Sequence, residues 1–105
     1  MEQIEVSIII VNYNTSHLIN QCIDSIINNC IGINYEIIIV DNASENLSKT
    51  ITKHPNISLK YIQLTENLGF GLANNEGIKI AKGRNILFLN PDTILLNNAI
   101  KILSA

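Results

Sequence analysis

The chain has 105 residues, a formal net charge of −2, 47% apolar residues and no tryptophan. This length predicts one domain, with an aliphatic core. The small charge, without a basic patch interleaved with aromatics, argues against nucleic-acid binding. The longest apolar run is far below the ~18 residues of a membrane span, so we expect a cytoplasmic protein, with peripheral attachment at the inner face of the membrane left open.

The first predicted elements are a strand over residues 5–12 and a helix over residues 16–29. The strand is nearly continuous in apolar residues, as is typical of a strand covered on both faces. Thr15 or Ser16 is expected to cap the helix through its side chain. Cys22 and Cys30 fit no zinc or redox spacing, and we expect buried free thiols. One face of the helix carries Leu18, Ile19, Cys22, Ile23, Ile26 and Ile27.

The middle of the chain predicts two further strands with a short helix between them. An apolar run favours a strand over residues 35–40. Ser44 offers a cap for a weakly amphipathic helix that carries Leu47 and Ile51 and ends before Pro55. Residues 58–64 roughly alternate in polarity, which indicates a half-exposed edge strand.

A glycine-bearing loop over residues 66–71 then leads into a predicted helix over residues 72–82. Gly77 would let this helix lie close on the sheet, and Gly83 is expected to end it. The expected inner face carries Phe70, Ala73, Gly77, Ile80 and Ala81.

The last predicted strand is the apolar run of residues 86–89, which is typical of a central strand buried on both faces. Pro91 has no N–H and ends the strand, so Asp92 is expected just beyond its carboxyl end. A final helix is expected to begin at Asn97 or Asn98.

Strands that alternate with helices predict an α/β fold: a Rossmann-like three-layer sandwich with a mainly parallel sheet. Right-handed crossovers favour the strand order 3-2-1-4. This order reverses direction between the first and fourth strands. The expected binding site is the crevice at that reversal, between residues 12–14 and 90–92.

Polar side chains follow each strand at this rim. Tyr13 could stack on a base, and Asp41 could accept a hydrogen bond from a pyrimidine imide N–H. The oxygens of Asn90 and Asp92 are hard ligands that suit Mg²⁺ or Mn²⁺. Taken alone, Asp41 and Asn42 are better explained as turn residues, and residues 90–92 could likewise be only a turn that ends the strand. The argument therefore depends on the common position of these residues at the carboxyl ends of successive strands.

Four segments resemble the motifs of family 2 glycosyltransferases of the GT-A fold, in the same order. Residues 6–14 (VSIIIVNYN) resemble the opening strand, and residues 39–44 (IVDNAS) resemble the second-strand motif. Residues 67–77 (NLGFGLANNEG) resemble the segment rich in asparagine and glycine of the rhamnosyltransferase-like branch. Residues 89–92 (LNPD) fall where the family has its Asp-x-Asp metal motif.

The resemblance implies a UDP- or dTDP-linked sugar donor, Mn²⁺ or Mg²⁺ as cofactor, and inverting transfer to a glycan or lipid-linked acceptor. It also implies a role in bacterial cell-wall or polysaccharide biosynthesis. Asp92 would bind the metal. The donor-binding positions implied are Asn12, Tyr13, Asn14, Asp41, Asn67, Gly69, Asn74, Asn75 and Asn90.

Two departures qualify this expectation. Asn90 stands where many members have the first Asp of the metal motif. The family's acceptor-binding half, with its catalytic base, lies beyond residue 105, so we expect residues 1–105 to be the N-terminal donor-binding part of a longer enzyme, with no catalytic base of its own. The fourth strand would then leave an exposed edge, which makes self-association to a homo-oligomer a hypothesis.

Three other classes of protein compete with a transferase domain. A non-catalytic nucleotide-binding module stays open, because the acceptor half is missing. A response-regulator-like domain would need an acidic cluster after the first strand, where this chain has Asn-Tyr-Asn. A nucleotidyltransferase would usually show a glycine-rich basic loop at the same place.

Overall fold

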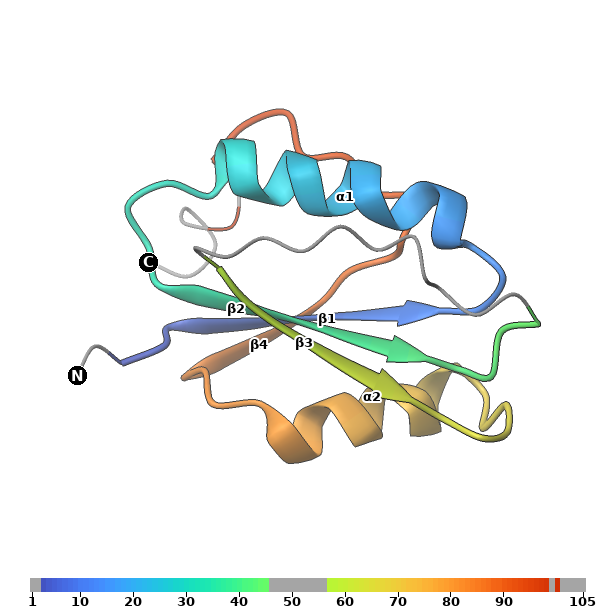
Figure 1. Cartoon of the computed structure of the whole chain (residues 1–105). Coiled ribbons are helices and arrows are strands. Elements are labelled where there is room, and N and C mark those ends of the chain that lie inside the picture. Colours follow the sequence, from blue (N-terminus) through green and yellow to red (C-terminus); the bar gives the residue numbers. More distant parts are fainter. Residues whose placement is uncertain (1–2, 46–56, 99, 101–105) are drawn as a thin grey trace.

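The computed structural model describes residues 3–45, 57–98 and 100. A parallel sheet in the order β3-β2-β1-β4 forms the middle of three layers, and α1 and α2 cover its opposite faces (Figure 1). The α/β class, the parallel pairing and the strand order 3-2-1-4 are therefore as predicted. The elements are β1 (Val6–Asn12), α1 (Ser16–Asn29), β2 (Tyr35–Asp41), β3 (Ser58–Gln63), α2 (Phe70–Ile80) and β4 (Asn85–Phe88).

The two central strands explain why their sequences lack a polar alternation. All seven residues of β1 are buried, and so are six of the seven in β2. Ile8 and Ile10 belong to the apolar cluster under α1, whereas Ile9 and Val11 belong to the cluster under α2. Both faces of β1 therefore contribute to a core, and a polar residue on either face would have to be buried.

The edge strands differ from one another in how well the sequence predicted them. β3 is half-exposed, as its alternating sequence indicated. The last strand, β4, lies at the sheet edge, as the predicted strand order requires. Its expected burial on both faces was wrong, because Ile86 and Phe88 are 40% and 46% exposed. Its apolar run resembles a central strand, but β1 is its only neighbour among the described strands. Asp92 therefore follows an edge strand.

The inner face of α2 is narrower than predicted. Ala73 and Gly77 are buried against the sheet, whereas Phe70 and Ile80 are 55% and 37% exposed. These two residues are the first and last of the helix, so only the middle of α2 packs on β1 and β2. The helix also ends two residues earlier than expected, at Ile80, with the N–H of Ala81 bonded to the carbonyl of Ile78.

The described residues settle only some of the other local predictions. Cys22 and Cys30 are buried free thiols, as expected. Helix α1 has Thr15 at its N-cap, but neither Thr15 nor Ser16 makes a side-chain capping bond. The helix predicted after Ser44 lies outside the described residues. Asn97 and Asn98 form a bend, and the predicted final helix lies almost wholly outside the described residues.

A buried carboxylate ties the amino-terminal end of the sheet together. Glu36 in β2 is fully buried and forms an ion pair with the Lys60 ammonium at 2.8 Å. Its other oxygen accepts from the Ser7 hydroxyl at 2.6 Å and from the backbone N–H of Lys82 at 2.7 Å. Burial opposes ionisation, but these donors outweigh burial, so the pKa of Glu36 lies below its usual value.

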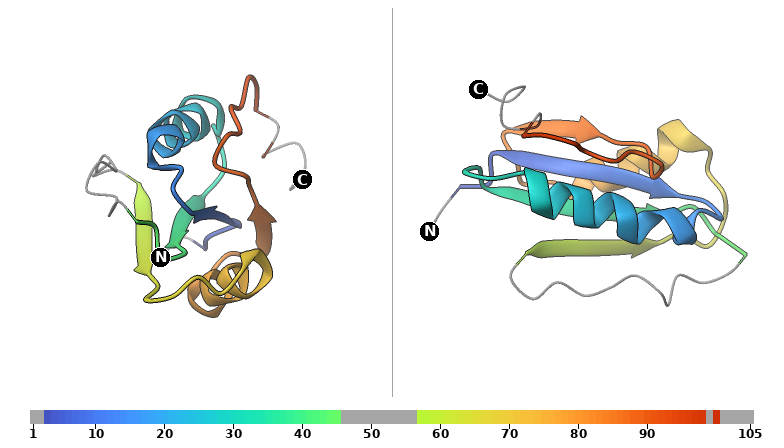
Figure 2. Two further views of the ribbon diagram at one scale, coloured as in Figure 1. Left: turned by 90° about the vertical axis from the view of Figure 1, so that its right-hand side faces the viewer. Right: turned by 90° about the horizontal axis from the view of Figure 1, so that it is seen from above.

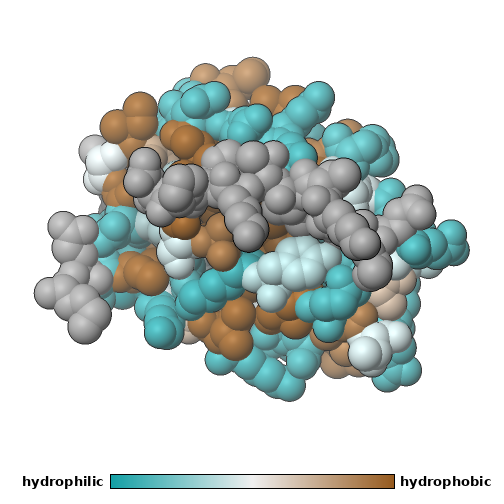
Figure 3. All heavy atoms as spheres, in the orientation of Figure 1, coloured by the Kyte–Doolittle hydropathy of each residue, from teal (hydrophilic) through white to brown (hydrophobic). Residues whose placement is uncertain are grey.

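The exposed surface mixes apolar and polar side chains. Figure 3 shows brown and teal residues interspersed over one face of the molecule. Among the described residues, no helix is both long and apolar enough to cross a membrane.

The close approach of α2 to the sheet can be tested at Gly77. A Cβ there would lie 2.8 Å from Cγ2 of Ile9, whereas a Cβ at Gly71 meets nothing within 4 Å. We expect Gly77→Ala to lower the free energy of unfolding by roughly 1–3 kcal/mol through overpacking. Gly71→Ala, in the same helix, should raise it by about 0.5–1 kcal/mol. Urea unfolding measures both, and equal effects would contradict the packing argument.

Candidate functional site

A pocket of about 430 Å³ opens at the carboxyl ends of the strands, where the strand order reverses. Loops that follow all four strands contribute to its wall, because parallel strands end at the same side of a sheet. This is the place where the sequence predicted a crevice. The lining residues are Val11, Tyr13, Thr15, Asn42, Asn67, Gly69, Phe70, Asn90 and Pro91.

Asp41 lies behind this pocket and is completely buried. Its Oδ1 accepts from Asn12 Nδ2 at 2.8 Å and from the Ser44 hydroxyl at 2.7 Å. Its Oδ2 accepts from the Ser44 N–H at 2.9 Å and from Gln63 Nε2 at 2.8 Å. Four protein donors thus occupy the lone pairs that a carboxylate offers.

These contacts keep Asp41 ionised although it is buried. Burial alone would raise its pKa, but the bonds from Ser44, Gln63 and Asn12 outweigh it, so the pKa of Asp41 lies below its usual value. The carboxylate joins the ends of β1, β2 and β3 through these three residues, and it fixes the shape of the rim.

The neighbouring Asn42 shapes the loop that enters α2. Its amide nitrogen donates to Asn67 Oδ1 at 2.9 Å, and its oxygen accepts from the N–H of Leu68 at 2.8 Å. Asn67 Oδ1 also accepts from the N–H of Gly69 at 2.8 Å. Gly69 adopts φ +81°, a conformation that other residues rarely tolerate. Asn67 and Gly69 are thereby held in the pocket wall.

Asn12 and Asn14 support the rim and do not line the pocket. Asn12 is fully buried and accepts from the N–H of Thr15 at 3.2 Å, so this side chain, and not Thr15 or Ser16, bonds to the start of α1. Asn14 has φ +56° and accepts from the N–H of Glu45 at 2.9 Å. Both residues hold the loop that presents Tyr13, which is 43% exposed.

The two asparagines of α2 lie differently from each other. Asn75 is exposed, and neither it nor Asn74 lines the pocket. Asn74 is 7% exposed, and its Oδ1 has no hydrogen-bond partner among the described residues. A buried acceptor without a partner is costly, so this oxygen suits a donor group from a bound molecule.

Asp92 lies beside the pocket in a tight turn. The turn is closed by the N–H of Thr93, which donates to the carbonyl of Asn90 at 3.0 Å. The Asp92 side chain is exposed and does not line the pocket, whereas Asn90 and Pro91 do. Burial, and then the charge of Asp92, raise the pKa of the Cys22 thiol to about 11, so this thiol stays protonated.

The residues at this turn fit a divalent cation that also binds a substrate. No group of three or more His, Cys, Asp or Glu side chains gathers as a metal cage within the part of the chain that the structure describes. One carboxylate, from Asp92, and the amide oxygen of Asn90 are hard donors. Mg²⁺ is commonly held by one or two carboxylates together with substrate phosphates, and this donor set suits that arrangement.

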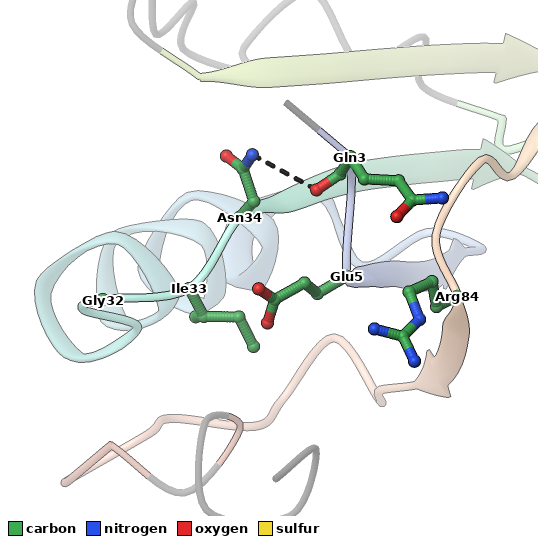
Figure 4. Close-up of a pocket in the computed structure, with 6 residues that line it drawn as sticks. All are labelled: Gln3, Glu5, Gly32, Ile33, Asn34 and Arg84. Carbon is green, nitrogen blue, oxygen red and sulfur yellow. Dashed lines mark hydrogen bonds between the residues drawn. The ribbon is translucent and has the colours of Figure 1, made fainter. Parts of the chain in front are cut away.

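A second, larger pocket of about 570 Å³ lies at the opposite end of the sheet (Figure 4). It is lined by Gln3, Glu5, Gly32, Ile33, Asn34 and Arg84. Asn34 Nδ2 donates to the carbonyl of Gln3 at 3.3 Å across its rim. Ligands of open α/β sheets bind outside the carboxyl ends of the strands, so the smaller pocket is the better candidate.

Residues 7–104 match the sequence profile described as "Glycosyl transferase family 2". The chain belongs to this family. The family that the resemblance implied is therefore confirmed.

Curated relatives of this chain are bacterial glycosyltransferases. The chain is 38% identical over 103 residues to a poly(ribitol-phosphate) beta-glucosyltransferase of Bacillus spizizenii, a match that covers 91% of this chain and 16% of the relative. It is 29% identical over 103 residues to an Escherichia coli UDP-Glc:alpha-D-GlcNAc-diphosphoundecaprenol beta-1,3-glucosyltransferase, with 97% of this chain and 40% of the relative covered. These are glucosyltransferases, so they do not point to the rhamnosyltransferase-like branch.

Solved structures share the same fold. S. aureus TarS 1–349 in complex with UDP-GlcNAc matches with a TM-score of 0.82 and 26% identity, over 96% of this chain and 30% of that one. A Pyrobaculum calidifontis mannosyltransferase in complex with GDP-Man and Mn²⁺ matches with a TM-score of 0.83 and 22% identity, over 99% of this chain and 31% of that one. The chain thus spans about a third of these structures and 16% of the B. spizizenii relative.

Sequence reasoning did not predict five residues of the pocket wall as binding candidates, namely Val11, Thr15, Asn42, Phe70 and Pro91. Asn42 stands next to Asp41 in the segment IVDNAS, in which only the carboxylate of Asp41 was predicted to contact the base. Phe70 was placed in the core, because it fits the helical spacing of the inner face. A signal for Phe70 was its position directly after Gly69, in the glycine-bearing loop that leads into the predicted helix.

The role of Asp41 as the shared hydrogen-bond acceptor of the rim can be tested with Asp41→Asn. This substitution replaces one acceptor oxygen by an NH₂ group, which then faces the N–H or O–H group that donated to it. We expect the free energy of unfolding at pH 7 to fall by about 1–3 kcal/mol. The pKa of Asp41 in the folded protein lies below its value in the unfolded chain. The ionised carboxylate therefore stabilises the fold fully above the unfolded pKa of ~3.9, and this stabilisation is lost as the pH falls through the folded pKa. The difference from wild type should therefore shrink in acid.

Urea unfolding between pH 3 and pH 7 measures this difference, with exposed Glu66→Gln as the control for removal of one charge. A difference that does not change with pH would contradict the role of the ionised carboxylate.

Proposed function

We propose that this chain is the donor-binding part of a glycosyltransferase that uses a UDP-linked sugar. The supporting observation is the pocket at the strand reversal, which joins two exposed aromatics to amide side chains. Aromatic faces and amides suit a nucleoside, which stacks and hydrogen-bonds. Support also comes from the TarS structures, whose complexes contain UDP and UDP-GlcNAc. A dTDP-linked donor has the same base edge and is the second choice.

In this proposal the base stacks on Tyr13, and Phe70 closes the pocket from the α2 side. The base imide reaches Asp41 by displacing Gln63, because Gln63 is exposed and is the donor to Asp41 most easily replaced by a ligand. Asn67 and Gly69 contact the nucleoside from the wall, and Asn74 offers its unpaired oxygen to a ligand hydroxyl. Asn12 and Asn14 act through the loop of Tyr13, and Asn75 contacts the part of the donor beyond the pocket.

The diphosphate end of the donor lies over the turn of residues 90–93. Asp92, with the amide oxygen of Asn90, would hold Mn²⁺ or Mg²⁺ there. When bound, such an ion neutralises the charge that develops on the departing diphosphate. The Mn²⁺ in the mannosyltransferase structure supports a divalent ion in this fold. Asp92 carries the ionic contact, because Asn90 contributes only a neutral oxygen.

Transfer in this proposal is inverting. An acceptor hydroxyl attacks the anomeric carbon and forms a new C–O bond, the bond to the diphosphate breaks with its electron pair on oxygen, and a carboxylate base takes the hydroxyl proton. No described residue is assigned as that base. The relatives' names support a glycan or lipid-linked acceptor, since one names poly(ribitol-phosphate) and another a diphosphoundecaprenol. A lipid-linked acceptor would bring the protein to the inner face of the membrane.

A nucleotide-binding module without catalysis is the alternative. It is favoured because neither carboxylate near the pocket is available as a catalytic base. Asp41 accepts hydrogen bonds within the rim, and Asp92 is assigned to the metal. This alternative predicts saturable binding of UDP and no release of free UDP from a UDP-sugar in the presence of any acceptor.

Calorimetric titration with UDP, dTDP and GDP, each with Mn²⁺ and with EDTA, tests the proposal. We expect UDP and dTDP to bind more tightly than GDP, and Mn²⁺ to increase the affinity. Asp92→Ala should remove the increase that Mn²⁺ causes. Tyr13→Ala should weaken binding roughly tenfold or more under both conditions, since base–aromatic stacking contributes about 1–3 kcal/mol.

Tyr13→Phe is the matched control, because it keeps the aromatic face. Binding of UDP that is unaffected by both Tyr13→Ala and Asp92→Ala would place the nucleotide elsewhere. No binding by folded wild-type protein would overturn the proposal for this chain.

A further inference from the structure

Helix α1 holds the segment that follows β4 through a row of polar side chains. Cys22, Ser25 and Asn29 are three and four residues apart, so they lie on one side of the helix. Figure 2 shows the segment after β4 running beside α1. None of the three residues lines the pocket.

Leu95 is bound by this row through both of its backbone polar groups. Its N–H donates to the Ser25 hydroxyl at 2.9 Å, and its carbonyl accepts from Asn29 Nδ2 at 2.8 Å. Ser25 also donates to the carbonyl of Cys22 at 2.8 Å, and Asn29 Nδ2 donates to the carbonyl of Ser25 at 2.9 Å. Both side chains are thus fixed to the helix as well as to the segment, which makes α1 a rigid support.

The turn that carries Asp92 lies between this support and the sheet. Before the turn, the N–H of Leu89 donates to the carbonyl of Ile9 in β1 at 2.9 Å. At the turn, the carbonyl of Asn90 accepts from the Cys22 thiol at 3.9 Å, which is a weak contact. After the turn, the Leu95 peptide is the next anchor. The exposed Asp92 side chain therefore takes its position from β1 on one side and from Ser25 and Asn29 on the other.

We propose that Ser25 and Asn29 are positioning residues for the metal-binding carboxylate of Asp92. This inference rests on the proposed function, in which Asp92 holds the divalent ion at the diphosphate. When either bond to Leu95 is lost, a partly buried peptide group is left without its partner, and the turn can shift toward solvent. Outer-shell partners of a metal ligand typically change metal affinity about 10- to 100-fold when they are removed.

Two adjacent asparagines of α1 provide a matched test. In Asn29→Asp the side chain keeps its size but has no N–H to donate to the Leu95 carbonyl. Asn28→Asp introduces the same charge one residue earlier, on an exposed position. We expect Asn29→Asp to reduce the gain in UDP affinity caused by Mn²⁺ at least tenfold, and to leave UDP affinity in EDTA unchanged. Asn28→Asp should behave as wild type in both titrations.

A double-variant comparison then asks whether Asn29 acts through Asp92. In the Asp92→Ala background, Asn29→Asp should cause no further change in the response to Mn²⁺. Ser25→Ala, which removes the other bond to Leu95, should reproduce the effect of Asn29→Asp by an independent route. Hydrogen exchange of the Leu95 amide should accelerate in Asn29→Asp and Ser25→Ala but not in Asn28→Asp.

The failure of this inference differs from the failure of the proposed function. If wild type binds UDP with a gain from Mn²⁺ and folded Asn29→Asp and Ser25→Ala show the same gain, the positioning role is overturned and the proposed function stands. If wild type binds no nucleotide under any condition, the proposed function is overturned, and the positioning role falls with it. Equal losses in Asn28→Asp and Asn29→Asp would also overturn the role, because the added charge would then be the cause.

Discussion

The buried carboxylate of Asp41 is the interaction on which the rim of this domain depends. It accepts from residues that follow or end three different strands, so one carboxylate holds all three strand ends together. A buried charge is stable only when its lone pairs are occupied, and here all four acceptor positions are used. The rim loops are therefore tied to one carboxylate, and together they form the wall of the pocket.

β2 carries a second buried carboxylate, Glu36, at its other end, and the two carboxylates hold different parts of the sheet. Glu36 binds β1, β3 and the segment after α2, whereas Asp41 binds the loops of the site. Between them the strand is entirely aliphatic and packs against a core on each face. Apolar packing has little directional preference, so the polar ends of β2 determine how the connecting segments lie.

The proposed site has a rigid side and a side that depends on α1. Tyr13, Asn42 and Asn67 are held by bonded loops at the ends of β1, β2 and β3. The turn of Asp92 leaves an edge strand instead, and an edge strand has a neighbour on one side only. Two side chains of α1 bond to the segment that follows the turn and so fix the position of the turn. Helix α1 itself contributes only its N-cap residue, Thr15, to the pocket wall.

The sequence by itself determined the four strands, the helices α1 and α2, the parallel sheet and the strand order 3-2-1-4. These follow from local apolar runs and from the handedness of crossovers, which need no knowledge of side-chain contacts. Only the tertiary structure decided which rim residues face the pocket. Asp41 and Asn42 are adjacent and equally polar, yet one is buried among four donors and the other lines the pocket, because their side chains point to opposite sides of the strand end. The tertiary structure also decided that Phe70 and the side chains of β4 are exposed. A residue at the end of a helix or at the edge of a sheet is buried only where a neighbouring segment packs over it.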